Sequence, residues 1–176
     1  MMPVAHVIDT NVLIVASAAD DQSPFQPEST PVEEARLRKI VHEWLAAFQD
    51  SDRSIVLDYD WKICGEYQNK MSPQDYGWLV VLNKYDLGQT VGVLLDMDRD
   101  GHAVLPSPLS ESVNDLADRK MVAAVLNAGG RDAGVDLVNA CDTDWHDCHA
   151  ALAAAGVDVH QLLPEWCEER RRRRLA

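Results

Sequence analysis

Short apolar runs alternate with segments of helical periodicity along this chain of 176 residues. The short runs predict strands, and the segments in which apolar residues recur every three or four positions predict helices. Strands that alternate with helices are typical of a parallel sheet with helices on both faces, because each crossover between parallel strands needs a long connection. We therefore expect the fold class α/β, as a three-layer α/β/α sandwich around a central parallel sheet.

The expected elements follow from these runs and from the residues that begin or end helices. Strands are expected at residues 3–8, 55–57, 91–95, 103–105, 136–139 and 157–160, and helices at residues 11–19, 60–71, 72–87, 114–128 and 144–155. A further helix is expected to begin at Thr30, because Thr30, Pro31 and Glu33 have the spacing of an N-terminal capping box.

The composition supports one domain and argues against some classes of protein. Hydrophobic residues make up 47% of the chain, which is enough for the core of a single domain. We place this domain at residues 1–165 and an arginine-rich tail at residues 166–176. The formal net charge of -13 argues against a general nucleic-acid binder, because the surface of such a protein is usually basic.

The chain also lacks the sequence signals of membrane insertion and export. No apolar run approaches the roughly 18 residues that a membrane span needs, and the first residues do not form a signal-peptide pattern. We therefore expect a cytoplasmic protein with no membrane partner. The cluster from Cys141 to His149 lacks the paired spacing of a zinc finger. Reduced thiols are expected at the four irregularly spaced cysteines, Cys64, Cys141, Cys148 and Cys167.

Acidic residues follow two of the expected strands. In the stretch HVIDTNVLI, Asp9 comes directly after a buried strand, and Asp142 and Asp144 come shortly after a later one. Ligands of an open α/β sheet bind at the carboxyl ends of its strands, so these carboxylates should lie near one another. Asp118 lies in the first turn of its expected helix and should reach the same edge, because helix side chains lean toward the N-terminus.

A group of carboxylates at one edge needs charge compensation. Two like charges repel by about 1 kcal/mol at about 4 Å even in bulk water. Glu66, in the helix after the second strand, can approach the group from the neighbouring position. Because oxygen ligands select hard cations, we expect Mg²⁺ or Mn²⁺ as the cofactor, bound by Asp9, Asp118 and Asp142.

Three stretches of the chain together resemble a known family. VIDTNVLI, DRKMVAAVLNAG and LVNACDTDW, in this order, are similar to the three sequence blocks of the PIN domain nucleases, which include the VapC-type toxins of toxin and antitoxin pairs. The resemblance implies a PIN-like fold and metal-dependent hydrolysis of phosphodiester bonds in RNA by an endoribonuclease. The site residues that it implies are the catalytic acids Asp9, Glu66, Asp118 and Asp142, with Asp144 as an auxiliary metal ligand.

The resemblance also suggests partners for the chain. RNA is the expected substrate, a cognate antitoxin or another inhibitor protein is an expected partner, and a homodimer is the expected assembly. The five arginines at residues 170–174 are a hypothesis for phosphate binding, with docking onto an acidic partner or onto the protein's own surface as the alternative. The residues expected to bind substrate are Thr10, Asn11, Arg119, Lys120, Arg171 and Arg172.

Other interpretations remain beside this one. Asp9 alone would be an N-cap, and Asp118 alone a first-turn acid that the helix dipole favours. Ala140 stands where the family usually has threonine, so a non-catalytic module that binds RNA or a protein through its arginine-rich tail is the alternative function. The sequence DMDRDG at residues 96–101 resembles an EF-hand loop and the opening of a HAD phosphatase, but its context favours a hairpin turn with solvated acids.

Overall fold

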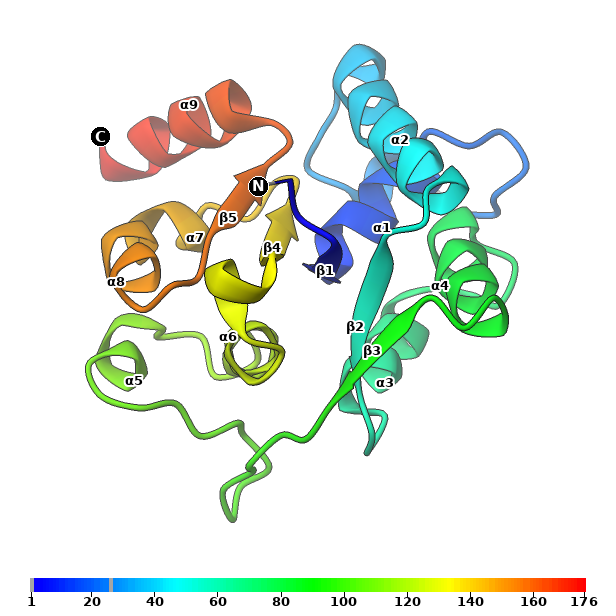
Figure 1. Ribbon diagram of the computed structural model, residues 1–176. Coiled ribbons are helices and arrows are strands. Elements are labelled where there is room, and N and C mark those ends of the chain that lie inside the picture. Colours follow the sequence, from blue (N-terminus) through cyan, green and yellow to red (C-terminus); the bar gives the residue numbers. More distant parts are fainter. Residues whose placement is uncertain (1, 26) are drawn as a thin grey trace.

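A five-stranded parallel sheet with helices on both faces forms the centre of the computed structural model, which describes residues 2–25 and 27–176 (Figure 1). The strand order is β3-β2-β1-β4-β5, so β1 is central and pairs with β2 on one side and β4 on the other. This architecture confirms the expected fold class, an α/β/α sandwich around a parallel sheet.

The bounds of the elements agree with most of the expected ranges. The strands are β1 (Ala5–Ile8), β2 (Ser54–Asp58), β3 (Thr90–Val93), β4 (Val135–Asn139) and β5 (Val159–Gln161). The helices are α1 (Thr10–Ala18), α2 (Ala35–Asp50), α3 (Lys62–Lys70), α4 (Tyr76–Asp86), α5 (Leu109–Ser112), α6 (Arg119–Asn127), α7 (Asp144–Asp147), α8 (His149–Ala154) and α9 (Pro164–Leu175), and the short 3-10 helices are η1 (Pro27–Ser29) and η2 (Gly130–Ala133).

The central strands are buried because helices cover both faces of the sheet. Every residue of β1 and β4 is buried, as expected for a parallel sheet that is covered on both sides. Figure 1 shows α2 above the sheet and α6 below it. α6 contacts β1, β2 and β4 and buries Met121, Val122 and Val125, and each such side chain contributes roughly 1.5–3 kcal/mol to stability.

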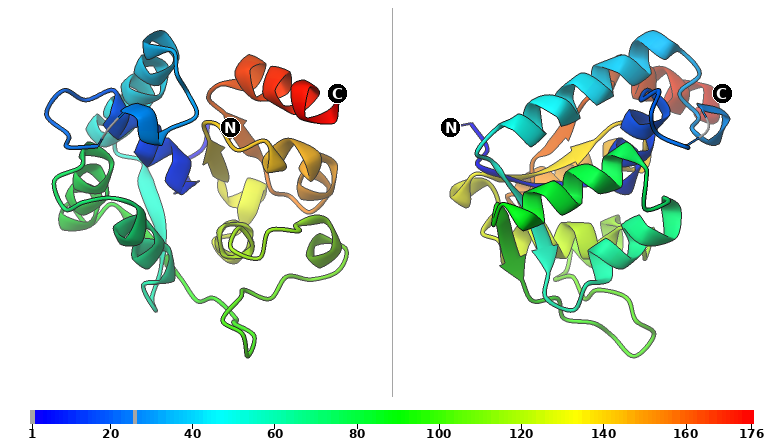
Figure 2. Two further views of the ribbon diagram at one scale, coloured as in Figure 1. Left: turned by 180° about the vertical axis from the view of Figure 1, so that it is seen from behind. Right: turned by 90° about the vertical axis from the view of Figure 1, so that its right-hand side faces the viewer.

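A second helical layer depends on one close contact between α1 and α4. A Cβ atom at Gly77 in α4 would lie 2.6 Å from the carbonyl oxygen of Leu13 in α1, so only glycine fits there. The backbone N–H of Gly77 donates to the hydroxyl of Ser17 at 2.8 Å. Figure 2 shows the same arrangement from behind and from the side, with α2 and α4 running next to each other.

The predicted capping box at Thr30 is wrong. The helix begins at Ala35, and the Thr30 hydroxyl accepts from the backbone N–H of Val32 instead of capping the helix. The Arg38 guanidinium donates to the carbonyl oxygens of Val32 and Glu33. Because a side chain binds these carbonyls and the Val32 side chain is buried in the core, the chain stays extended until Glu34.

The strand predicted at residues 103–105 is also wrong. Ala103 forms only an isolated antiparallel bridge with Met97. The Asp98 carboxylate between them accepts from the backbone N–H groups of Asp100 and His102, each at 2.9 Å. These bonds close a hairpin turn, which confirms the interpretation of DMDRDG as a turn.

Three predicted helices differ from the structure in extent. The helix predicted at residues 72–87 begins only at Tyr76, because the Asp75 carboxylate accepts from the backbone N–H of Ser72 and closes a turn. The helix predicted at residues 114–128 begins only at Arg119, because the Asp115 carboxylate accepts from the N–H of Ala117 and closes a turn. The helix predicted at residues 144–155 is divided at Cys148 into α7 and α8.

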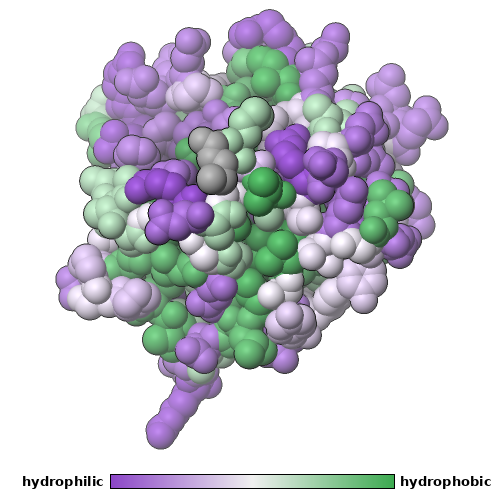
Figure 3. Space-filling model, in the orientation of Figure 1, coloured by the Kyte–Doolittle hydropathy of each residue, from purple (hydrophilic) through white to green (hydrophobic). Residues whose placement is uncertain are grey.

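The arginine-rich segment is helical and attached to the domain. α9 spans the predicted boundary between residues 165 and 166, and its Cys167 is fully buried, with its thiol 3.4 Å from the carbonyl oxygen of Ala140. Hydrophilic surface covers the upper part of the molecule, where α2 and α9 lie (Figure 3). Among the described residues, none of the helices has the length and apolar character needed to cross a bilayer.

Candidate functional site

Asp9 is both a helix cap and a member of the predicted site. It directly follows the central strand β1 and is the N-cap of α1, with one carboxylate oxygen accepting from the backbone N–H of Asn11 at 3.1 Å. The other oxygen accepts from the indole N–H of Trp145 at 2.6 Å. Because only 7% of Asp9 is exposed, these two donors fix the direction in which its carboxylate points.

The backbone next to Asp142 is held by a pair of asparagines. The Asn11 side-chain oxygen accepts from the backbone N–H groups of Ala140 and Cys141, at 2.8 and 3.2 Å. The Asn11 amide donates to the side-chain oxygen of Asn139, which also accepts from the backbone N–H of Asp142 at 3.0 Å. Asn11, predicted to bind substrate, is therefore occupied in joining the end of β1 to the loop after β4.

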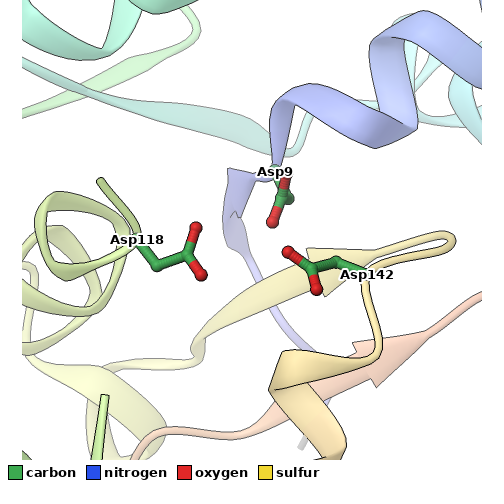
Figure 4. A group of neighbouring side chains, drawn as sticks. All are labelled: Asp9, Asp118 and Asp142. Atoms are coloured by element: carbon green, nitrogen blue, oxygen red, sulfur yellow. The ribbon is translucent and has the colours of Figure 1, made fainter. Parts of the chain in front are cut away.

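Asp118 completes a group of three carboxylates. It occupies the N-cap position of α6, but its side chain makes no capping hydrogen bond in the part of the chain that the structure describes. One carboxylate oxygen from each of Asp9, Asp118 and Asp142 lies within 4.8 Å of the others. Figure 4 shows these three side chains pointing into a common space from three different elements. The structure thus brings together the three aspartates that the sequence placed at one edge.

A second group of acids shares Asp118. Carboxylate oxygens of Asp115, Asp118 and Asp144 also lie within 4.8 Å of one another. These residues line a cleft of about 90 Å³ together with Trp145 and Cys148. Asp115 was not among the predicted site residues. It lies three residues before Asp118, and this spacing could have indicated that the two side chains lie in one turn of the chain.

The acids lie in an environment that disfavours their charge. Burial raises the pKa of Asp9 from 3.8 to about 7, against the hydrogen bonds from Trp145 and Asn11, which lower it. Burial and the neighbouring charges of Asp9 and Asp142 raise the pKa of Asp118 to about 8. The pKa of Asp142 is raised too, again mainly by burial. A cation among these oxygens would favour their ionised forms.

Glu66 stands beside this group with partners of its own. One of its oxygens accepts from the Thr10 hydroxyl at 2.6 Å, and the other forms an ion pair with the ammonium group of Lys120. Lys120 also donates to the carbonyl oxygen of Ala117 at 2.9 Å. Thr10 and Lys120, both predicted to bind substrate, are therefore bonded to a predicted catalytic acid.

The predicted arginines lie in two different environments. The Arg119 guanidinium donates to the carbonyl oxygens of Ser110 and Val113, so it holds the segment before α6. Arg171 of α9 pairs with Asp147 of α7.

Arg174 and Arg172 of α9 also have acidic partners. Arg174, which was not among the predicted site residues, pairs with both Asp144 and Asp147. The Arg172 side chain is 74% exposed and lies 3.8 Å from Glu168 in its own helix. Arg171 and Arg174 therefore attach α9 to the protein's own surface, which is one of the alternatives stated for this segment.

Comparisons with known proteins give no relative for this chain. No protein-family model matches it, and neither curated proteins nor solved structures yield a significant match.

Proposed function

We propose that the chain is a metal-dependent endoribonuclease of the PIN type, which hydrolyses phosphodiester bonds in RNA. The observation that carries the proposal is the convergence of Asp9, Asp118 and Asp142, which are distant in sequence, on a space where their oxygens lie within 4.8 Å of one another. Independent helix caps would not require this convergence. The resemblance of the three sequence blocks to PIN nucleases supports the same assignment.

The donor set fits Mg²⁺ or Mn²⁺. It contains only carboxylate oxygens, which hard divalent cations prefer, and no cysteine or histidine is a member. A bound cation of this kind supplies a nucleophilic hydroxide at neutral pH and stabilises negative charge on phosphate oxygens. Asp9, Asp118 and Asp142 would hold it.

Neighbouring residues fix the positions of these metal ligands. The Trp145 indole orients Asp9, and Asn11 and Asn139 hold the loop that carries Asp142. Fixed ligands of this kind reduce the reorganisation that binding requires. We also propose a cytoplasmic location, a homodimer and an inhibitor or antitoxin partner, as the resemblance implies.

Cleavage of a labelled single-stranded RNA in the presence of Mn²⁺ tests the proposal. The wild-type protein should cleave, and chelation of the metal or the substitution Asp118→Asn should abolish cleavage while the circular dichroism spectrum is unchanged. Asp86→Asn, which removes an exposed acid at the end of α4, is the matched control and should cleave like the wild type. Equal cleavage by Asp118→Asn and wild type would refute the proposal.

The alternative function makes a different prediction for the same proteins. A non-catalytic module would bind RNA or a protein through α9 and would show no Mn²⁺ affinity that depends on Asp118. Isothermal titration with Mn²⁺ therefore separates the two functions even if no substrate RNA has been found.

A further inference from the structure

Two of the acids that the resemblance assigned to the metal site already have cationic partners from the protein itself. Both oxygens of Glu66 are engaged, one by the Thr10 hydroxyl and one by the Lys120 ammonium group. The side chains of Lys120 and Glu66 are only 14% and 24% exposed, so water screens their attraction weakly. A cation bound to Glu66 would have to displace Lys120.

Asp144 also has a cationic partner. The Arg174 guanidinium lies 3.1 Å from an Asp144 oxygen, 3.1 Å from the Thr143 hydroxyl and 2.5 Å from an Asp147 oxygen. This pair is about half exposed, with side-chain exposures of 46% and 51%, so it is weaker than the pair of Lys120 and Glu66.

Asp9, Asp118 and Asp142 differ from these two acids in their partners. Asp9 accepts only from neutral donors, Trp145 and Asn11, and the structure gives Asp118 and Asp142 no ion pair within the described chain. Among the described residues, Asp9, Asp118 and Asp142 form no ion pair of the kind that Glu66 and Asp144 form.

We infer that the site takes a single divalent cation, at Asp9, Asp118 and Asp142. Lys120 at Glu66, and Arg174 at the second acidic group of Asp115, Asp118 and Asp144, supply the positive charge that a further cation would otherwise supply at each place. Glu66 and Asp144 are then not metal ligands, and Lys120 and Arg174 together set the metal stoichiometry. The inference rests on the metal site of the proposed function and goes beyond it by fixing the number of ions.

Counting bound Mn²⁺ in the full-length protein tests this inference without any substrate. Isothermal titration and the electron paramagnetic resonance spectrum should give one ion in the wild type, with the six-line signal of an isolated Mn²⁺. Lys120→Gln frees Glu66 and should bind two ions, with the broadened signal of a coupled pair. Arg174→Gln should also bind a second ion, but with lower affinity than Lys120→Gln does. The reason is that the pair of Arg174 and Asp144 is more exposed than the pair of Lys120 and Glu66.

Three matched variants separate the charge from other effects. Lys120→Arg keeps the charge and should bind one ion, as should Arg172→Gln, which removes an exposed arginine elsewhere on α9. Lys120→Gln combined with Glu66→Gln should return to one ion. If Lys120→Gln does not fold, Arg174→Gln still tests the inference. A single bound Mn²⁺ ion in Arg174→Gln would show that Arg174 does not exclude a second cation.

The outcomes distinguish this inference from the proposed function. Two ions in the wild type, or a count of one in folded Lys120→Gln, would overturn the inference and leave a metal-dependent nuclease intact. One ion in the wild type and two in Lys120→Gln, without cleavage of any RNA, would support the inference and overturn the proposed activity. A wild type that binds no Mn²⁺ would overturn both.

Discussion

The substitution Asp9→Asn should make the metal-free protein more stable, and more so as the pH rises. In the folded protein, burial raises the pKa of Asp9 from 3.8 to about 7. Between these two values the folded state holds a proton that the unfolded state has lost. The unfolded state therefore binds fewer protons, and the free energy of unfolding falls as the pH rises through this window.

The size of the effect follows from the shift. One pKa unit corresponds to about 1.4 kcal/mol. The shift therefore costs about 4 kcal/mol near pH 8, where Asp9 is ionised, and about 2 kcal/mol near pH 5, where folding requires Asp9 to take up a proton. Asparagine removes this cost, but it replaces one of the two carboxylate oxygens with an NH₂ group, so one of the two donors, Trp145 or Asn11, loses its acceptor. The lost hydrogen bond to a charged group costs roughly 1.5–3 kcal/mol. We expect Asp9→Asn to be nearly neutral near pH 5 and about 2 kcal/mol stabilising near pH 8.

Urea denaturation in the presence of a chelator measures this difference. Unfolding curves of wild type and Asp9→Asn at the two pH values give the free energy of unfolding of each protein. Asp86→Asn, at an exposed acid, is the control, and its effect should be the same at both values. Added Mg²⁺ should stabilise the wild type near pH 8 and leave Asp9→Asn nearly unchanged.

One result would refute this argument. If Asp9→Asn destabilises the protein by the same amount at both pH values, the capping hydrogen bond outweighs the buried charge. Asp9 would then be a structural cap only, and the electrostatic case for a cation at this position would fail.

Three further substitutions test other parts of the structure. Trp145→Phe removes a donor to Asp9, so it should raise the pKa of Asp9 further and destabilise the protein by about 1–3 kcal/mol near pH 8, as measured by urea denaturation. Gly77→Ala should cost about 1–3 kcal/mol, because the new methyl group would meet the backbone of Leu13; an unchanged denaturation midpoint would contradict the close contact of α1 and α4. Asn11→Ala should weaken Mn²⁺ binding about 10–100-fold in isothermal titration without removing a ligand, because the loop before Asp142 loses its attachment to α1.

The convergence of the three aspartates could be predicted because it depends on topology. Parallel strands present their carboxyl ends at one edge, and Asp9 and Asp142 follow neighbouring strands of the sheet. Asp118 was placed correctly at this edge even though its helix begins later than predicted. The edge of the sheet at which a residue lies can therefore be predicted correctly even when the predicted start of a helix or strand is wrong by a few residues.

The partners of the acids could not be predicted in the same way. Nothing in the sequence spacing pairs Lys120 with Glu66, which is 54 positions away, or Trp145 with Asp9. These contacts depend on rotamers and on the packing of helices that are distant in the chain. The failed capping box at Thr30 has a similar cause, because a tertiary contact made by Arg38 overrides a local signal.

The strand order has a consequence for the timing of synthesis. The central strand β1 is made first, but its neighbour β4, which carries the third aspartate on the loop that follows it, emerges from the ribosome only after most of the chain. A nascent chain therefore has Asp9, and later also Asp118, before it has Asp142. Any activity that needs all three carboxylates begins only when translation of the domain is nearly finished.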